Sequence, residues 1–520
     1  MNLTRLTRSY FSRFDRQMLS AAANAEASQR RLLGDLLATA SSTLYGTSYK
    51  FPEIKSYEQF AAKVPIVGYE DLRPAIMRMV DGQRDVLWPG RVERFAQSSG
   101  TSGGKSKYIP LTARSLRQCH YRGGTDVVAR YISLNPDSRL FDGRSFILGG
   151  SYANELRLHD SRVKVGDLSA TLIDCINPLA NIVRTPPKKI ALMADWQKKL
   201  ELMIPIVARQ NVTNLSGVPS WFLTVLKRVL EYTGAGNIKE VWPNLEVFFH
   251  GGISFAPYRE QYNAIIDPAK MKYMETYNAS EGFFALQDDP ADPAMLLLMD
   301  TDVFYEFLPL DQLETEHPRA VPSWEVEKGK TYALVITSSN GLWRYLIGDT
   351  VRVASLNPLK IVIAGRTKSF INAFGEELMV YNADAALARV CAQTGAEVAN
   401  YTAGPSFATD RSKGCHQWLV EFNRMPESLD DFARLLDDSL QQENSDYQAK
   451  RSGDIFLGRL KLEAVPVGTF DRYLASTGKL GGQRKVPRLC NDRKVLDAIA
   501  KMLDRYDTTS DKDNISIPTD

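Results

Sequence analysis

Hydrophobic residues recur at helical spacing in several long segments of the chain. The spacing predicts helices over residues 5–40, 195–210 and 220–232, each with one apolar face. Ser220 is a candidate N-cap of the third helix, and Gly234 is its candidate stop. Short apolar runs typical of buried strands lie between the helices. Helices that alternate with such strands indicate a layered α/β fold.

The C-terminal part of the chain has a different pattern. Apolar runs at 418–422 and 460–467 are typical of strands, and they flank a predicted helix over 429–442. A last helix is predicted over 493–506. This order indicates an α+β region. A chain of 520 residues is also too long for one ordinary core, so we expect two or three packed units.

Composition and charge exclude several classes of protein. Hydrophobic residues make up 44% and charged residues 24%, the balance of a soluble globular protein. The net charge of +3 is spread along the chain, so no nucleic-acid partner is predicted, and nothing indicates a partner protein. The chain has no signal-peptide pattern and no apolar run near the ~18 residues of a membrane span, which predicts a cytoplasmic protein. The 5 scattered cysteines favour reduced thiols and give little support to a structural metal site.

The densest cluster of glycine and hydroxyl residues lies between positions 97 and 110. A Walker-type loop would need a glycine where Ser99 stands, and Pro110 opposes the helix that must follow it. The flanking runs at 94–96 and 108–111 are instead typical of strands. Because glycine amides and hydroxyl groups can converge on an anion, the sequence predicts a phosphate-binding loop between two strands. A mobile linker of Ser and Gly is the alternative.

Four other segments combine glycine with chemically useful side chains. Gly-Gly-Ile-Ser at 251–254 and Met-Glu-Thr-Tyr-Asn-Ala-Ser-Glu-Gly at 274–282 come at the ends of predicted strands. Ligands of open α/β sheets bind beyond the carboxyl ends of strands, so these segments are candidate walls of a nucleotide site. Arg-Tyr-Leu-Ile-Gly-Asp at 344–349 places a carboxylate after a glycine, and Gly-Gly-Gln-Arg-Lys-Val-Pro-Arg at 481–488 places a lysine on a flexible loop.

With these five segments in this order, the chain resembles the acyl-adenylating enzymes, the superfamily of firefly luciferase and acyl-CoA synthetases. More narrowly, it resembles the acyl acid amido synthetases, known from plant auxin- and jasmonate-conjugating enzymes and also found in bacteria. The likeness covers nearly the whole chain, including Leu-Tyr-Gly-Thr at 44–47, Tyr-Glu-Asp-Leu at 69–72 and Val-Leu-Trp-Pro-Gly at 86–90. Arg344 before Tyr345 departs from the superfamily order and resembles the amido synthetase branch.

The resemblance implies a fold of two domains. Residues 1–365 would form a large multi-layer α/β adenylate-forming domain that binds ATP and the acyl acid. Residues 366–520 would form a smaller, mobile α+β lid domain.

The resemblance also implies roles for individual residues. Tyr277 would pack on the adenine, Asp349 would accept hydrogen bonds from the ribose, and Glu281 would ligate Mg²⁺ between the phosphates. Lys485 would neutralise charge during attack on the α-phosphate. The implied ATP-binding positions are Ser98, Ser99, Gly100, Thr101, Ser102, Gly103, Gly252, Ile253, Ser254, Tyr277, Ser280, Asp349 and Arg366.

The helix after the phosphate loop contributes to the acyl-acid pocket in the resembled family. Arg117, Tyr121 and Arg122 are therefore candidate pocket residues by location. The alternative is that both arginines are solvated helix charges.

The implied reaction is ATP-dependent ligation. The oxygen of a small-molecule carboxylic acid would attack the α-phosphorus of Mg-ATP, and an amine, expected to be that of an amino acid, would then displace AMP to form an amide. This reaction depends on aligning the acid with the α-phosphorus and on neutralising phosphate charge. A site of glycine turns, one carboxylate and mobile cations suits both needs. Two alternatives stay open: an acyl-CoA synthetase that forms a thioester, and an inactive nucleotide-binding relative.

Overall fold

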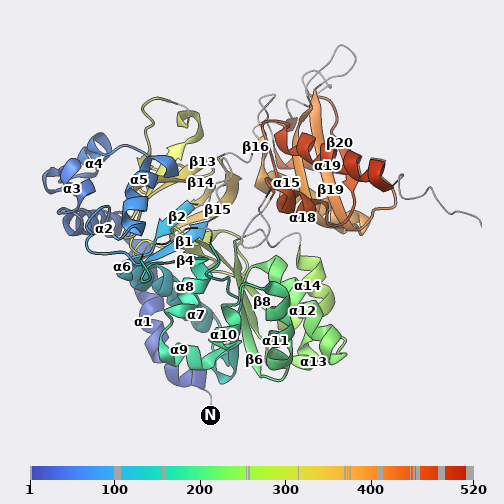
Figure 1. Ribbon diagram of the computed structural model, residues 1–520, viewed down its shortest axis with the longest axis horizontal. Helices are drawn as coiled ribbons and strands as arrows, with labels where there is room; N and C mark the ends of the chain where they lie inside the picture. The colour runs from blue at the N-terminus through green and yellow to red at the C-terminus, as the bar shows by residue number, and fades with distance from the viewer. Residues whose placement is uncertain are drawn as a thin grey trace, which may run out of the picture. The chain divides into compact units, whose positions relative to one another are not determined.

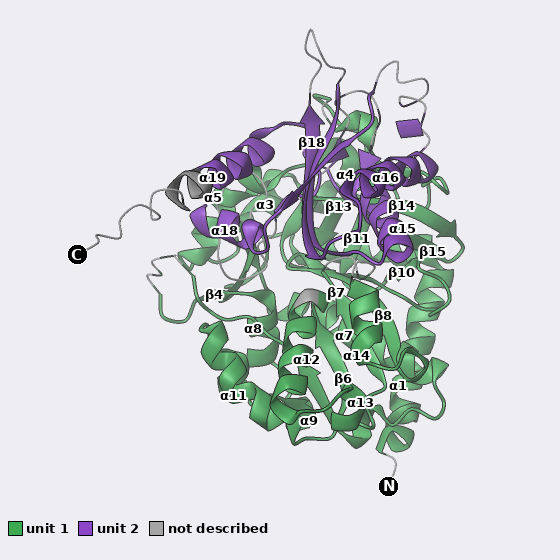
Figure 2. Cartoon of the chain, turned by 90° about the vertical axis from the view of Figure 1, so that its right-hand side faces the viewer, with its two compact units in different colours: residues 1–363 green, residues 364–520 purple. Residues whose placement is uncertain are grey.

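The structure is a computed structural model with two compact units, residues 1–363 and 364–520 (Figures 1 and 2). It describes residues 3–98, 107–154, 156, 158, 160–252, 255, 258–313, 315–367, 370–371, 373, 376, 378–406, 414–444, 447–448, 451, 457–477 and 486–510. No helix within these ranges is both long enough and apolar enough to cross a membrane.

The chain begins with two helices where the sequence predicts one. Helix α1 (Leu3–Ala23) ends before Asn24, and α2 (Ala25–Thr39) starts after it. The Asn24 side chain donates a hydrogen bond to the Ser20 carbonyl, an interaction that competes with helix continuation. The leucine stripe of α2 faces the core as predicted, with Leu36 fully buried. Three helices follow: α3 (Leu44–Ser48), α4 (Tyr57–Lys63) and α5 (Tyr69–Val80).

A 12-stranded sheet forms the centre of the larger unit. Its parallel half has the order β5-β3-β6-β7-β8, with bounds β3 (Arg144–Ile147), β5 (Arg184–Thr185), β6 (Val212–Gly217), β7 (Val247–Gly251) and β8 (Lys272–Ala279). The other half is antiparallel and contains β9 (Gly282–Leu286), β10 (Met295–Leu297), β11 (Val303–Pro309), β12 (Val321–Pro322), β13 (Thr331–Ser338), β14 (Leu342–Leu356) and β15 (Leu359–Arg366).

Helices cover both faces of the parallel half. Phe248 and Phe249, adjacent on β7, point to opposite faces because side chains alternate along a strand. The Phe248 ring lies 5.1 Å from the ring of Phe222 in α12 (Pro219–Thr233), and the Phe249 ring lies 5.6 Å from that of Tyr131 in α7 (Tyr121–Leu134). The predicted layered α/β fold is therefore confirmed. The remaining helices between the strands are α8 (Leu168–Asp174), α9 (Pro178–Val183), α10 (Lys188–Ala191), α11 (Trp196–Ala208), α13 (Ile238–Val241) and α14 (Arg259–Ile265).

One predicted helix start is wrong. Helix α12 begins at Pro219, with Val218 as its N-cap residue, so Ser220 lies inside the helix. Proline is favoured in the first helical turn because its fixed φ suits the helix. It lacks the backbone N–H, and an N–H at this position would have no partner within the helix. The predicted stop is confirmed, since Gly234 adopts a left-handed conformation with φ of 71°.

A separate three-stranded sheet holds the strands that flank the glycine-rich loop. Strand β1 (Arg94–Ser98) pairs antiparallel with β2 (Lys107–Pro110) and parallel with β4 (Lys164–Gly166). The strands predicted on both sides of this loop are therefore confirmed. The loop itself, residues 99–106, lies outside the described residues.

The smaller unit is α+β, as its pattern predicts. A three-stranded sheet of β18 (Glu397–Ser406), β19 (Cys415–Arg424) and β20 (Lys461–Val465) is antiparallel between β18 and β19 and parallel between β19 and β20. Its buried face packs on α15 (Val380–Thr394) and α16 (Leu429–Glu443). The unit also contains the hairpin β16 (Phe370–Ile371) and β17 (Leu378–Met379), and the helices α18 (Thr469–Ser476) and α19 (Lys494–Ser510).

The helical segment after β2 is irregular. Thr112 caps α6 (Ala113–Ser115), as its hydroxyl accepts a hydrogen bond from Ser115 N; a π-helical turn (Leu116–His120) then leads into α7. Gly123 lies against β9, where an added Cβ would come within 2.4 Å of the Phe283 ring. The neighbouring Gly124 is exposed and has no atom within 4 Å of such a Cβ.

These two adjacent glycines give a matched pair of variants. Gly123→Ala should lower the free energy of unfolding by about 1–3 kcal/mol, because the new methyl group overlaps a buried ring. Gly124→Ala should raise it by about 0.5–1 kcal/mol, because alanine favours the helix. Urea unfolding of both variants measures the difference, and equal effects would contradict the close approach of α7 to β9.

A buried histidine gives a pH-dependent prediction. His120 is 4% exposed, neither ring nitrogen has a hydrogen-bond partner among the described residues, and burial lowers the pKa of its imidazole to about 4. Below the ordinary pKa of about 6.5 the unfolded chain takes up a proton that the folded chain does not. His120 alone should therefore lower the free energy of unfolding by about 2 kcal/mol when the pH falls from 7.5 to 5.

The measurement is urea unfolding at both pH values. His120→Leu should show a pH dependence smaller by about that amount, since a leucine cannot be protonated. His317→Asn, a change at an exposed histidine, should keep the wild-type dependence. An unchanged dependence in His120→Leu would mean that His120 is protonated in the folded protein.

Candidate functional site

The carboxyl ends of β7 and β8 form one wall of the candidate nucleotide site. An added Cβ on Gly251 would lie 2.3 Å from the Thr276 carbonyl oxygen, so only glycine allows this approach of the two strands. Gly252 follows with a φ of 79°. His250, just before this turn, is 3% exposed, and burial lowers its pKa to about 3. The imidazole next to this turn is therefore neutral at pH 7.

A hydrogen bond joins two of the predicted ATP-binding residues. The Tyr277 hydroxyl, from β8, donates to Asp349 Oδ2, from β14, at 2.8 Å. Both side chains are largely buried, at 4% and 8% exposed. Asp349 lies inside the strand, directly after Gly348, which has a φ of 94°. The structure thus brings the third and fourth predicted segments together.

The predicted magnesium ligand lies in the same region. Glu281 is in the turn between β8 and β9, and it is 5% exposed, so it is not a surface carboxylate. Asn340, in the turn between β13 and β14, donates a hydrogen bond to the Glu281 carbonyl oxygen at 2.8 Å. Ser280 beside it is 9% exposed. Nothing in the sequence pattern singled out Asn340.

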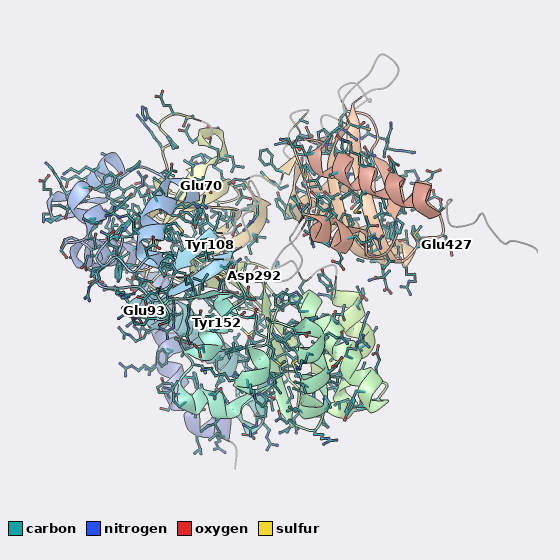
Figure 3. The ribbon with its side chains drawn as sticks, viewed as in Figure 1. Glu70, Glu93, Tyr108, Tyr152, Asp292 and Glu427 are labelled. Carbon is teal, nitrogen blue, oxygen red and sulfur yellow. The ribbon has the colours of Figure 1, made fainter. Side chains whose placement is uncertain are left out.

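The base of the glycine-rich loop is held by a lysine and two tyrosines. Lys107 pairs with Ser98, and its Nζ donates to the Tyr345 hydroxyl at 3.3 Å. The ammonium lies 5.8 Å and 5.9 Å from the ring centroids of Tyr69 and Tyr345, within cation–π range. The Tyr69 hydroxyl accepts a hydrogen bond at 2.7 Å from the backbone N–H of Tyr108, which is labelled in Figure 3. These tyrosines stand in segments that carry the resemblance, but the motifs alone give no reason for this contact.

The three candidate acyl-acid residues have different environments. Arg117 is exposed on the π-helical turn. The Tyr121 hydroxyl donates to the Leu172 carbonyl at 2.8 Å. Arg122 is only 10% exposed in its side chain, so it is not the solvated charge of the alternative interpretation. Its guanidinium donates through Nε to Asp126 and through Nη2 to Asp300, so two carboxylates of this chain already balance its charge.

The structure does not describe every predicted site residue. Ser99, Gly100, Thr101, Ser102, Gly103, Ile253, Ser254 and Lys485 fall outside the described residues. Arg366 is the last residue of β15 and belongs to the smaller unit. Within the described part of the chain, no group of three or more His, Cys, Asp or Glu side chains is arranged to hold a metal ion.

Solved structures with the same fold are adenylate-forming ligases. The GH3.15 acyl acid amido synthetase matches with a TM-score of 0.75 at 18% identity, and 96% of each chain is covered. A 2-hydroxyisobutyryl-CoA ligase in the postadenylation state matches with a TM-score of 0.58 at 14% identity, over 93% of each chain. The architecture described above is therefore the adenylate-forming fold.

Comparison of the amino-acid sequence identifies the family within this fold. Models of the GH3 family N-terminal, central and C-terminal domains match residues 15–271, 296–366 and 381–494. Indole-3-acetic acid-amido synthetase GH3.3 of Arabidopsis thaliana is 24% identical, over 92% of this chain and 91% of the relative. 4-substituted benzoates-glutamate ligase GH3.12 of the same plant is 23% identical, over 94% and 96%. The chain belongs to the GH3 family.

Proposed function

We propose that this protein is an ATP-dependent acid–amino acid ligase. It activates a small carboxylic acid as an acyl-adenylate with release of pyrophosphate, and then transfers the acyl group to the amine of an amino acid with release of AMP. The observation that carries this proposal is the Tyr277–Asp349 hydrogen bond, because it joins two segments implied to bind one nucleotide. Family membership supports the same reaction, since relatives named amido synthetase or glutamate ligase align over nearly the whole chain.

The described residues fit the proposed nucleotide. Asp349 offers a carboxylate to the vicinal hydroxyls of ribose, and Gly251 and Gly252 allow the backbone to approach a flat base. Lys107 places a positive charge beside Ser98, at the base of the glycine-rich loop, where the triphosphate is proposed to bind. Arg366 and Lys485 would be supplied by the smaller unit, the proposed lid domain, and the larger unit would bind ATP and the acid.

Glu281 suits the proposed role of magnesium ligand. Mg²⁺ prefers hard oxygen ligands and often takes one or two carboxylates together with substrate phosphates, so a single glutamate is sufficient. The bound ion would neutralise phosphate charge as the acid attacks. The Glu281 carbonyl is bonded to Asn340, and this hydrogen bond fixes the backbone from which the carboxylate extends.

Thioester formation is the nearest alternative function. It shares the adenylation half-reaction, and the 2-hydroxyisobutyryl-CoA ligase has the same fold. The family assignment favours the amide product. The second alternative, an inactive nucleotide-binding relative, is disfavoured because Glu281 and Asp349 are both present and buried.

Removal of Glu281 tests the site. Glu281→Ala should lower magnesium-dependent ATP–pyrophosphate exchange by at least about 10²-fold, since the variant lacks a preorganised electrostatic interaction. Its thermal unfolding without ATP should stay close to that of the wild type. Glu231→Ala, at a side chain that is 63% exposed on α12, is the matched control and should exchange normally. A normal rate in Glu281→Ala would remove this residue from the site.

The second half-reaction distinguishes amide from thioester. A panel of carboxylic acids is first screened for pyrophosphate release, and the active acid is then offered with each amino acid or with coenzyme A. We expect AMP release and an amide product with at least one amino acid. A product formed with coenzyme A alone would overturn the proposed function in favour of an acyl-CoA synthetase.

A further inference from the structure

Helix α1 has one side that packs within the larger unit. It lies against α7 (Figure 1), where Asp15 forms an ion pair with Arg130 at 3.6 Å. The Phe11 ring stacks on the ring of Phe141, with the two centroids 5.3 Å apart, and Met18 is buried. These contacts set the orientation of α1 about its own axis.

The other side of α1 presents large apolar side chains to solvent. Leu3, Leu6 and Tyr10 are 42%, 58% and 61% exposed. Their spacing of three and four residues places them on one stripe of the helix. The Leu3 N–H donates to Asp142 Oδ1 at 2.8 Å, and Asp142 lines a cavity of about 420 Å³ together with Ile182 of α9, which is also exposed. Single exposed apolar residues are common, but a group of them marks a contact surface.

The exposed side of α1 is also basic. Arg5, Arg13 and Arg16 are exposed, and Arg13 lies three residues after Tyr10, so it continues the same stripe. The one acidic residue of α1 is Asp15, which is buried on the side that faces α7. From Arg5 to Arg16 the exposed side therefore carries positive charge, and no negative charge of its own, over about 17 Å of helix axis.

Three kinds of partner would meet this surface differently. A second copy of the chain, docked about a twofold axis, would bring like-charged arginines together, which is unfavourable. Nucleic acid would suit the arginines, but its phosphate backbone offers no apolar surface to Leu3 and Leu6. An anionic bilayer suits both kinds of side chain. Arginines interact with the anionic headgroups, while leucine and tyrosine enter the boundary between headgroups and acyl chains.

We propose that the exposed side of α1 is a docking surface for a bilayer that contains anionic phospholipids. The surface consists of Leu3, Arg5, Leu6, Tyr10, Arg13 and Arg16. The helix axis would lie parallel to the bilayer, as in other amphipathic helices that bind at the interface. Because α7 already holds the other side of α1, docking needs no change of fold. This binding is independent of the proposed ligase activity.

Co-sedimentation of the full chain with vesicles tests the docking. Vesicles of equimolar phosphatidylcholine and phosphatidylserine should bind the protein, and vesicles of phosphatidylcholine alone should bind it at least about tenfold more weakly, because they lack the anionic lipid. Salt at about 1 M should release most of the bound protein, since the Debye length falls to about 3 Å. Equal binding to both kinds of vesicle, or binding to neither, would overturn the proposal.

Charge variants test the arginines. Arg13→Gln should lower partitioning onto the mixed vesicles roughly fivefold and Arg13→Glu roughly 25-fold, since each unit of charge near an anionic surface contributes about a factor of five. Arg228→Gln, at an arginine whose side chain is 56% exposed on α12, is the matched control and should bind as the wild type does. Equal losses in Arg13→Gln and Arg228→Gln would indicate attraction by net charge alone and would overturn the proposal.

An apolar variant tests contact with the acyl-chain boundary. Leu6→Gln should lower partitioning by about tenfold, because a leucine side chain leaves water on docking. Leu202→Gln, at a leucine that is 44% exposed on α11, is the matched control and should bind normally. A loss in Arg13→Gln without a loss in Leu6→Gln would overturn the bilayer in favour of a polar polyanion such as an acidic protein.

Two further measurements keep the test decisive. All of these side chains are exposed, so the variants should unfold at the wild-type temperature and keep the wild-type rate of ATP–pyrophosphate exchange without vesicles. Leu6→Ala, a milder change, takes the place of Leu6→Gln if that variant unfolds. Analytical ultracentrifugation of the protein alone gives its oligomeric state, and a dimer that Leu6→Gln converts to a monomer would overturn the proposal in favour of a second copy of the chain.

Discussion

The hydrogen bond between Tyr277 and Asp349 can form only because the large sheet is curved. Three strands, β9, β10 and β15, lie between β8 and β14 in the order of the sheet. In a flat sheet four strand spacings would separate them by about 19 Å. A tyrosine and an aspartate joined at 2.8 Å cannot span that distance, so the sheet is not flat between these two strands. The curl brings segments separated by about seventy residues of sequence to one site.

A buried ion pair supports the strand that carries Asp349. Arg344, also on β14, has a positive φ of 44° and makes a bidentate contact with Glu306 of β11, and the two side chains are 4% and 0% exposed. It also donates to the carbonyls of Ala61 and Val64 at the end of α4. Removing one partner of such a pair typically costs about 3–5 kcal/mol. The segment 344–349 thus has two kinds of contact. Arg344 holds β14 against its neighbours, whereas Tyr345 contacts Lys107 and Asp349 contacts Tyr277.

The sequence predicted the features that depend on local pattern. Helical spacing placed α11 and α12, and glycine next to strand ends marked the turn after β7. The break at Asn24 and the start of α12 at Pro219 were missed, because several residue types can occupy a helix end and only the packed structure selects one. Contacts such as Asn340 with Glu281 and Lys107 with Tyr345 depend on how distant strands pack, which no local spacing encodes. The ion pairs of Arg122 were missed for the same reason.

The pairing of Ser98 with Lys107 has a consequence for the base of the glycine-rich segment. Neighbouring strands are about 5 Å apart, so the two ends of this segment are clamped next to each other by the register of β1 and β2. Because the ladder of β1 and β2 sets this separation, a substitution of Ser98 or Lys107 changes a side chain and leaves the spacing of the two backbones intact.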